Sequence, residues 1–471
     1  MSDLTFLSAS AMADQIRREK VSPVKLVDAH IDRISRLNPR LNAFVQVDID
    51  GARAAALAAE KAVTRGHSLG RLHGVPISIK SSIAVAGMLH ESGTRLRAGV
   101  VAQQDAVLVA RLRAAGAIIL GVTNTPEYLM AWETDNLLHG RTNNPWDLDR
   151  TSGGSSGGES AAIAAGCSAA GVGSDGGGSI REPAHFTGIC GLKPTPGRIP
   201  TTGHFPSSAG PFALLGAVGP MARAIADLQL MFETMAGPDD GDPCSAPVPL
   251  RKISSAEFKP VRIGYFEDDG RTPVTPETRQ AVRAAAAALQ CAGFRTTPFR
   301  PDNLERIRQL WWKLFGTAGG MMLRPLIQGC ESQLSPIFKE YLQWAAAGPD
   351  HTGQSLLNTW AERDMLRNEF LVKMREFPIL LCPAAAIPAF RHGERTWVID
   401  GKAVGYLDAW SYTAWFNLLG NPAAVVPVGK SAEGLPIGVQ IVGRPWEEEL
   451  VLAVAAELEK AAGAWRKPPI D

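Results

Sequence analysis

Two glycine-rich blocks that contain serines, together with one lysine, are the residues of this chain best suited to chemistry. The first block, TSGGSSGGE, runs over 151–159, and the second, VGSDGGGSIREP, runs over 172–183. A serine hydroxyl attacks a carbonyl carbon effectively only when a base removes its proton. Consecutive glycines let several backbone N–H groups converge on the oxyanion that then forms. The combination predicts acyl transfer through a serine nucleophile.

Lys80 is the candidate base, because it ends the apolar segment VPISIK (75–80), which is predicted to be a strand. Burial lowers the pKa of a lysine amine, since it disfavours the charged form. Lowering that pKa from about 10.4 to roughly 7–8 costs some 3–4 kcal/mol. A fold sustains such a cost most readily at an active site. We therefore expect activity to rise toward alkaline pH as Lys80 loses its proton.

Three segments resemble the amidase-signature family: the lysine in GVPISIK, the GGSSGGE block and the DGGGSIR block. The interval from Ser155 to Ser179 and the segment GICGLKPTPGRIP (188–200) resemble the same family. The resemblance extends from about residue 8 to the end of the chain and is strongest over 70–200. Each motif alone is weak evidence, but the set is specific.

The resemblance implies a role for each member of a proton relay. Ser179 matches the family's nucleophile, Ser155 matches a bridging serine, and Lys80 matches the terminal base. It also implies a cis peptide bond at Gly154–Ser155. The implied reaction is cleavage of a carboxylic amide C–N bond through a covalent acyl-enzyme, with neither a metal nor an organic cofactor.

The glycines before the nucleophile match the family's oxyanion hole, which the backbone N–H groups of Gly176, Gly177, Gly178 and the nucleophile would form. Asp175 and Arg181 match positions that brace this loop. Gly176 departs from the family pattern, in which a larger residue usually stands there. The space beside the nucleophile is therefore expected to differ from that of relatives.

The substrate is expected to be a small apolar or aryl amide, and esters or carbamates are further candidates. Met130 and Trp132 precede the signature serines and are predicted to form part of the pocket wall. Two aromatic groups also suggest an apolar pocket. They are Trp311, Trp312, Phe315, Tyr341, Trp344 and Trp360, and then Tyr406, Trp410, Tyr412, Trp415 and Phe416. The alternative function is that of a glutaminase subunit that supplies ammonia to an amidotransferase, although the Tyr/Ser-rich region typical of that subunit is not found here.

Two other nucleophiles are possible from the sequence. GSSGG over 154–158 fits the G-x-S-x-G pattern of α/β-hydrolases, with Ser156 as nucleophile, but the polar residues before it predict a loop where that motif needs a strand. Cys190 or Cys167 with His185 is the second alternative. Both cysteines lie among small apolar residues, which favours buried, inert thiols.

Composition restricts the class of partner. The chain has 471 residues, with 48 basic and 47 acidic side chains and a net charge of +1, so a nucleic-acid partner is not expected. It contains no run of about 18 apolar residues and no signal-peptide pattern at its start. Its six cysteines form no CxxC pair, which predicts reduced thiols. We expect a cytoplasmic monomer or homodimer that does not bind membranes.

Alternation of strands and helices predicts an α/β fold, a three-layer α/β/α sandwich around a central mixed β-sheet. The predicted strands lie at 75–80, 117–122, 261–266, 379–382, 423–428 and 437–442, and the predicted helices at 22–38, 50–64, 105–115, 276–291, 303–315, 354–376, 408–419 and 447–462, with another beginning at Thr125-Pro126. Residues 142–220 show little periodicity and are predicted to be irregular and functional. One domain over 1–471 is expected, with N-terminal helices over 1–66, a signature core over 70–220 and a helical cover of the substrate pocket over 303–376.

Overall fold

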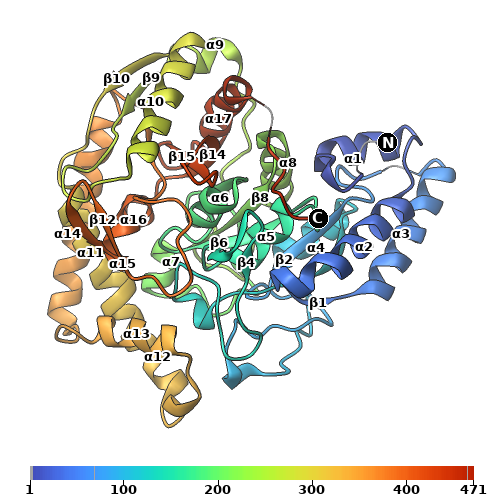
Figure 1. The fold of residues 1–471 in the computed structure, drawn as a ribbon, viewed down its shortest axis with the longest axis horizontal. Helices are drawn as coiled ribbons and strands as arrows, with labels where there is room; N and C mark the ends of the chain where they lie inside the picture. Colours follow the sequence, from blue (N-terminus) through green and yellow to red (C-terminus); the bar gives the residue numbers. More distant parts are fainter. Residues whose placement is uncertain (1–3, 68, 464) are drawn as a thin grey trace.

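The computed structural model describes residues 4–67, 69–463 and 465–471. An 11-stranded mixed sheet runs through the middle of the molecule (Figure 1). In spatial order its strands are β1 (Phe44–Val47), β3 (Ile118–Thr123), β2 (Pro76–Lys80), β6 (Ala170–Asp175), β8 (Ala217–Ala222), β7 (Cys190–Lys193), β14 (Ala423–Lys430), β15 (Pro436–Val442), β11 (Ile379–Pro383), β9 (Arg262–Tyr265) and β10 (Arg295–Pro298).

Helices cover both faces of this sheet. One face is packed by α1 (Ala9–Arg17), α4 (Val107–Ala114), α8 (Ile225–Met235), α10 (Pro276–Cys291) and α17 (Glu448–Ala462). The other face is packed by α2 (Pro23–Leu41), α3 (Ile49–Thr64), α5 (Gly157–Ala164), α6 (Arg181–Thr187) and α16 (Ser411–Leu418). The predicted three-layer sandwich with a central mixed sheet is thus confirmed.

The register of the central strands brings the two chemical segments together. β2 pairs in parallel with β3 on one side and with β6 on the other. The carboxyl ends of parallel neighbours meet at the same edge of a sheet. Lys80 is the last residue of β2 and Asp175 is the last residue of β6, so the lysine and the glycines that follow Asp175 reach that edge together.

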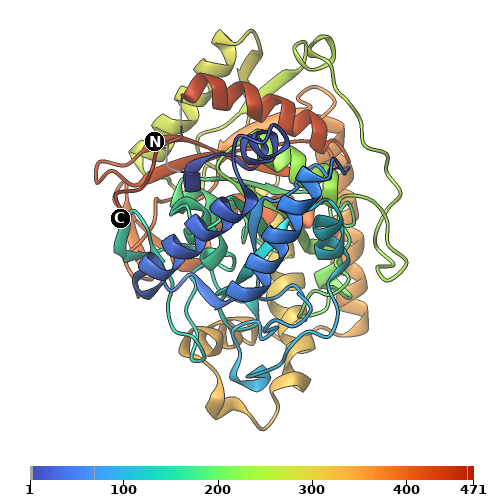
Figure 2. The ribbon, with the colours of Figure 1, turned by 90° about the vertical axis from the view of Figure 1, so that its right-hand side faces the viewer.

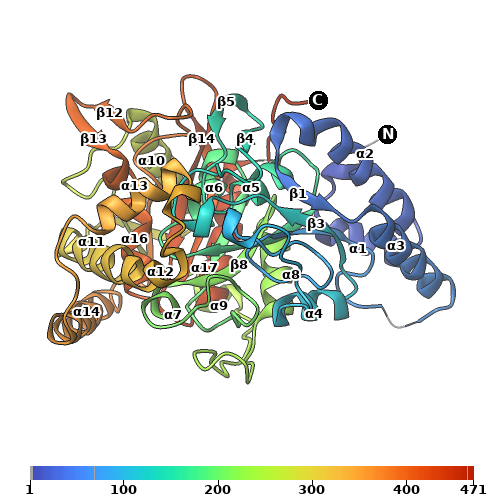
Figure 3. The same ribbon diagram turned by 90° about the horizontal axis from the view of Figure 1, so that it is seen from below.

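A group of helices lies at the end of the molecule opposite α2 and α3 (Figures 1 and 3). It contains α11 (Leu304–Trp312), α12 (Gly319–Ile327), α13 (Pro336–Ala345) and α14 (Gly353–Lys373), and the π-helical turn Lys313–Ala318 joins the first two. The other elements are α7 (Pro211–Leu215), α9 (Ser255–Phe258), α15 (Tyr406–Ala409) and the paired strands β4 (Asn143–Asn144) with β5 (Asp147–Thr151) and β12 (Thr396–Ile399) with β13 (Lys402–Gly405).

The C-terminal tail returns to the N-terminal part of the chain (Figure 2). The ring of Trp465 stacks on Phe6 with centroids 5.6 Å apart, and Arg40 donates a hydrogen bond of 3.1 Å to the backbone oxygen of Asp471. Within the described ranges, every helix is too short or too polar to cross a bilayer. The assignment of the whole chain to one domain stays a prediction.

Two local predictions are wrong. Residues 142–220 are not irregular, because they contain α5, β6, α6, β7 and β8 in a buried arrangement. Only a short 3-10 turn, Glu127–Leu129, follows Thr125-Pro126 in place of the expected helix. In that turn Tyr128 has φ of +51°, a left-handed conformation that interrupts a helix.

Candidate active site

The amine of Lys80 lies at the centre of a cluster of buried hydroxyl groups. Its Nζ atom is 2.7 Å from Oγ of Ser155, 2.9 Å from Oγ of Ser156 and 3.1 Å from Oγ of Ser174. Lys80 itself has no exposed surface. The sequence-predicted pair Lys80 and Ser155 is therefore in hydrogen-bond contact, and the peptide bond Gly154–Ser155 is cis, as the resemblance implies.

Burial lowers the pKa of Lys80 to about 7, against the opposing effect of the carboxylates of Asp175 and Glu159. Glu159 follows the signature serines and is also fully buried, where it accepts hydrogen bonds from Ser78 and, at 2.7 Å, from Thr123. Burial raises the pKa of Glu159 to about 7, although both hydroxyl donors oppose the change. At neutral pH a substantial fraction of Lys80 is therefore an uncharged amine.

Ser179 lies near this lysine cluster, in the segment between the end of β6 and the start of α6. Ser155 and Ser179 line one cavity, here called the Ser155 cavity, with a volume of about 500 Å³. The backbone N–H of Ser156 donates a hydrogen bond of 3.2 Å to the backbone oxygen of Ser179, which joins the two signature loops directly. Ser179 is 8% exposed, so its surroundings are largely protected from bulk water.

The peptide planes of the glycine run Gly176–Gly178 are fixed from behind by three side chains. Trp311 donates its indole N–H to the oxygen of Gly176 at 3.0 Å. The oxygen of Gly177 accepts from the indole of Trp132 at 3.1 Å and from the hydroxyl of Thr413 at 2.9 Å. Because C=O and N–H point in opposite directions across a trans peptide, holding each oxygen also sets the direction of the next N–H.

The oxygen of Asp175 is held in the same way by Asn417 at 3.1 Å. In the described chain, the hydrogen bonds include no acceptor for the N–H groups of Gly176, Gly177 or Ser179. The N–H of Gly178 differs, because it donates to Oδ1 of Asp175 at 2.7 Å. The expectation that Gly178 contributes to the oxyanion hole is thus revised, since its only N–H is already bound to a carboxylate.

The carboxylate of Asp175 organises the turn that follows β6. It accepts both Nε and Nη2 of Arg181 at 2.9 Å, together with the N–H of Ile180 at 3.1 Å. Burial alone would raise the pKa of Asp175, but the charge and hydrogen bonds of Arg181 lower it well below its usual range. The predicted bracing role of Asp175 and Arg181 agrees with these contacts.

The glycine at position 176 has a steric explanation. A Cβ atom built on Gly176 would lie 2.9 Å from Cε2 of Phe315, closer than carbon atoms normally approach. The backbone at Gly176 has no positive φ, so conformation does not require glycine there. The ring of Phe315 instead occupies the space that a larger residue would need.

A second cavity also borders Ser179 and is here called the aromatic cavity; its empty volume, including space open to solvent, is about 360 Å³. Both cavities are lined by Leu129, Met130, Ser179 and Phe315. The aromatic cavity also contains Ala131, Trp132, Gly177, Trp312, Tyr341, Trp344, Tyr406 and Leu407. The Ser155 cavity also contains Tyr128, Ser174, Asp175, Gly176, Thr201, His204, Pro206, Ser208, Phe212, Gly216, Ala217 and Val218.

The structure places only some of the pocket residues predicted from sequence at the two cavities. Met130 and Trp132 line the cavities, as do five of the aromatic residues, whereas Tyr412, Trp415 and Phe416 are buried in the core. The sequence did not predict that Thr201 and His204 line a cavity, or that Trp311 donates a hydrogen bond to the glycine run. Their partners are remote in sequence, so spacing along the chain carries no signal for them.

The structure places Ser156 away from the substrate space. Its hydroxyl donates to the oxygen of Ser174 at 3.3 Å, and among the described residues that line the two cavities Ser156 is not present. A short strand, β5, does precede it, contrary to the expected loop, but β5 belongs to a separate two-stranded sheet. An α/β-hydrolase elbow needs its strand in the central sheet.

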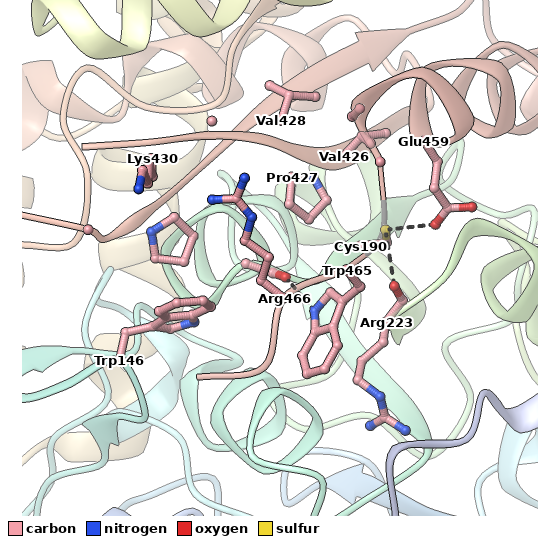
Figure 4. A pocket seen from close by; sticks show the side chains of 16 residues that line it. Trp146, Cys190, Arg223, Val426, Pro427, Val428, Lys430, Glu459, Trp465 and Arg466 are labelled. Carbon is pink, nitrogen blue, oxygen red and sulfur yellow. Dashed lines mark hydrogen bonds between the residues drawn. The ribbon is translucent and has the colours of Figure 1, made fainter. Parts of the chain in front are cut away.

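The thiol alternative lies in a different cavity (Figure 4). Sγ of Cys190 lies 3.9 Å from the backbone oxygen of Arg223 and 3.8 Å from the carboxylate of Glu459. Burial first, and then the charge of Glu459, raises the pKa of the thiol well above its usual range. Both ring nitrogens of His185 are engaged by backbone groups, at Gly438 and Ile387. Neither residue is arranged as a nucleophile with its base.

Comparison with known proteins decides the family. The sequence profile of the Amidase family matches residues 25–452. The chain belongs to the amidase family. It is 36% identical over 466 residues to the indoleacetamide hydrolase of Bradyrhizobium diazoefficiens strain USDA 110, covering 97% of this chain and 86% of that protein.

Two further relatives agree with this assignment. The acylamidase of Rhodococcus erythropolis is 35% identical over 474 residues, covering 100% of this chain and 98% of the relative. The crystal structure of a bacterial aryl acylamidase of the amidase-signature family superposes with a TM-score of 0.86 at 27% identity, covering 98% of this chain and 97% of the other. This chain therefore has the amidase-family fold, and that fold holds the residues Lys80, Ser155 and Ser179 described above.

Proposed function

We propose that this amidase-family chain hydrolyses a carboxylic amide of a small apolar or aryl compound, with Ser179 as nucleophile, Ser155 as bridging acid–base and Lys80 as terminal base. The observation that carries the proposal is the buried amine of Lys80, with a pKa of about 7, at 2.7 Å from Ser155. Both serines line the same cavity. A base with a pKa near the operating pH is what proton transfer requires.

The number of hydrogen atoms on the neutral amine of Lys80 supports proton transfer from Ser155 to this lysine. The hydroxyl of Ser156 donates to the oxygen of Ser174, so its own oxygen is left to accept an N–H from Lys80. A neutral amine has two N–H groups and one lone pair. With Ser156 and the Ser174 hydroxyl as acceptors, the lone pair of Lys80 faces the hydroxyl of Ser155 and can take its proton.

The reaction then proceeds in two halves. Oγ of Ser179 bonds to the carbonyl carbon as its proton moves through Ser155 to Lys80, and the C–N bond breaks as Ser155 returns that proton to the leaving nitrogen. Water then attacks the ester of Ser179 and loses its proton along the same path. The acid is released and the free serine is restored.

The developing oxyanion is proposed to bind the N–H groups of Gly176, Gly177 and Ser179. These groups have no acceptor within the described structure, and the side chains behind the run hold their peptide planes in place. Donors that are fixed before the reaction do not need to reorganise as charge develops, which is the main source of such stabilisation.

The test combines covalent labelling with kinetics. A fluorophosphonate probe and peptide mapping should place the adduct on Ser179, and Ser179→Ala should abolish turnover of a simple aryl amide by the purified chain. An adduct on Ser156 or on a cysteine would refute the assignment. Turnover restricted to free glutamine would favour the glutaminase alternative. The proposal further takes the chain to be a cytoplasmic monomer or homodimer, which size-exclusion chromatography with light scattering and cell fractionation would check.

A further inference from the structure

We propose that Glu182 is a positioning residue for Ser155: together with Thr134, it holds the peptide unit that leads into the bridging serine. The inference rests on the proposed function, because it acts through the acid–base role given there to Ser155. It adds two residues to which the family resemblance assigns no role. Both act on the reaction only through the place in which they hold the Ser155 hydroxyl.

The peptide unit between Gly153 and Gly154 is held at both its oxygen and its nitrogen. The hydroxyl of Thr134 donates a hydrogen bond of 2.9 Å to the oxygen of Gly153. The N–H of Gly154 donates one of 3.0 Å to Oε2 of Glu182, and both hydrogen bonds are buried. Because a peptide unit is planar, fixing its two polar groups also fixes its plane. The backbone therefore enters Ser155 in one direction.

The hydroxyl of Ser155 depends on that direction. Its Oγ lies 2.7 Å from Nζ of Lys80, and it must also come within reach of Ser179 during the reaction. Ser155 lies in the turn between β5 and α5, so no helix or strand of its own fixes its backbone. The hydroxyl of Thr134 also accepts the N–H of Gly157 at 3.2 Å, which anchors the chain on the other side of the serine. A misplacement of about 1 Å can lower a rate by about 100-fold.

Glycines before the serine allow this close approach. A Cβ atom built on Gly153 would lie 2.7 Å from Oε2 of Glu182. A Cβ atom built on Gly154 would lie 2.6 Å from the backbone nitrogen of Glu133. The backbone at Gly154 has no positive φ, so packing and not conformation excludes a side chain there. The turn that carries Ser155 is thus packed directly against the carboxyl group of Glu182.

Glu182 holds Gly154 as an uncharged acid. The residue has no exposed surface, and within the described structure its Oε1 atom has no hydrogen-bond partner. Burial, and then the carboxylates of Glu133 and Asp175, raise the pKa of Glu182 well above its usual range, although the hydrogen bond from Gly154 opposes the change. The proton then lies on Oε1, and Oε2 accepts the N–H. A glutamine side chain offers the same carbonyl acceptor, whereas leucine offers none.

Two substitutions of Glu182 separate the hydrogen bond from the rest of the side chain. The assay is hydrolysis of 3-phenylpropanamide, an aryl amide of the proposed class, with Ser179→Ala measured beside each variant. Glu182→Leu should lower kcat by roughly 10- to 100-fold, because it leaves the N–H of Gly154 without an acceptor. KM should stay within about twofold of wild type, because within the described structure Glu182 is absent from the linings of both cavities. Glu182→Gln should keep at least about half of the wild-type kcat.

A variant at the other end of the peptide and a matched control complete the test. Thr134→Val changes the volume of the side chain little, removes the donor to Gly153, and should also lower kcat while KM is kept. It decides the question if Glu182→Leu does not fold. Glu459→Leu is the control, because the carboxylate of Glu459 accepts the N–H of Ile225 at 2.9 Å away from both cavities. It should lower the midpoint of thermal unfolding and leave kcat unchanged.

The outcomes that overturn the positioning role differ from those that overturn the proposed function. An unchanged kcat in folded Glu182→Leu or in Thr134→Val would overturn the role, provided that turnover still depends on Ser179. A loss in Glu182→Gln as large as that in Glu182→Leu would do the same, and so would an equal loss in the control. If wild type is no more active than Ser179→Ala, the proposed function itself fails, and the positioning role fails with it.

Discussion

Replacing Trp311 by phenylalanine removes the one donor, among the described residues, that holds the peptide between Gly176 and Gly177. The indole N–H lies 3.0 Å from the oxygen of Gly176, and phenylalanine keeps a ring in the same position but has no N–H. A neutral hydrogen bond contributes a net 0.5–1.5 kcal/mol, roughly. If that energy holds the N–H of Gly177 in the direction of the oxyanion, kcat should fall by about 2- to 13-fold. Complete loss of one oxyanion donor, about 10²–10³-fold, sets the upper bound.

The assay is steady-state release of ammonia from 3-phenylpropanamide by Trp311→Phe, with thermal unfolding measured in parallel. KM should stay within about twofold of wild type, because the contact acts on the transition state and not on the bound amide. Trp312→Phe is the control. Trp312 lines the aromatic cavity, and the described structure gives it no hydrogen bond to the glycine run, so its change should appear in KM.

Three results would refute this reasoning. An unchanged kcat in Trp311→Phe would mean that the glycine peptides are held well enough without the indole. A rise in KM alone would mean that Trp311 serves only as pocket wall. A fall in kcat in both variants, matched by equal losses of thermal stability, would point to general loosening of the helical region.

Three further predictions follow from the site. Because burial lowers the pKa of Lys80 to about 7, kcat/KM should rise about tenfold from pH 6 to 8 as the neutral amine forms, and a flat profile with chemistry rate-limiting would contradict the assignment of the base. Gly176→Ala should lower activity because its Cβ would meet Phe315, and adding Phe315→Leu should restore part of the loss; no restoration would mean that the contact is not the cause. Asp175→Asn should lower the free energy of unfolding by about 3–5 kcal/mol in urea titrations, because it leaves the buried guanidinium of Arg181 without its charge partner, and a loss below about 1 kcal/mol would contradict this.

The amphipathic helices and the aliphatic strands were the easiest to predict, because they carry ordinary patterns. The helix at 276–291 was predicted with the bounds that α10 has, since Thr275 caps it and apolar residues recur at helical spacing. β2 and β3 were predicted within one residue from their aliphatic runs. The helix at 22–38 continues to Leu41, so Pro39 lies inside it and does not end it.

The glycine-rich part of the signature core, residues 142–220, was the hardest to predict. β6 reads AGVGSD and lies between β2 and β8. Val172 is its single β-branched residue, so the segment carries little of the pattern that normally marks a strand. Small residues are needed there because a Cβ on Gly171 or Gly173 would meet Glu159 or Ser156.

Of the site itself, Lys80, Ser155 and Ser179 were predicted from motif and family resemblance, and their catalytic roles stay a prediction. The partners of the glycine run were not, because Trp311, Thr413 and Asn417 are brought to it only by tertiary packing of remote helices. The hydrogen bond from the N–H of Gly178 to Asp175 could not be predicted either, because the sequence does not distinguish the backbone N–H of one glycine from that of the next.

The helical segment that begins with α11 provides both the indole that holds the oxygen of Gly176 and the neighbouring rings of Trp312 and Phe315 that line the aromatic cavity. With the proposed roles of these residues, a change in this segment should alter the turnover and the selectivity of the chain together. A redesign that grafts another relative's version of this segment to admit a new substrate must bring a hydrogen-bond donor to the place of the Trp311 indole. Otherwise the graft would gain a new specificity and lose turnover at the same time.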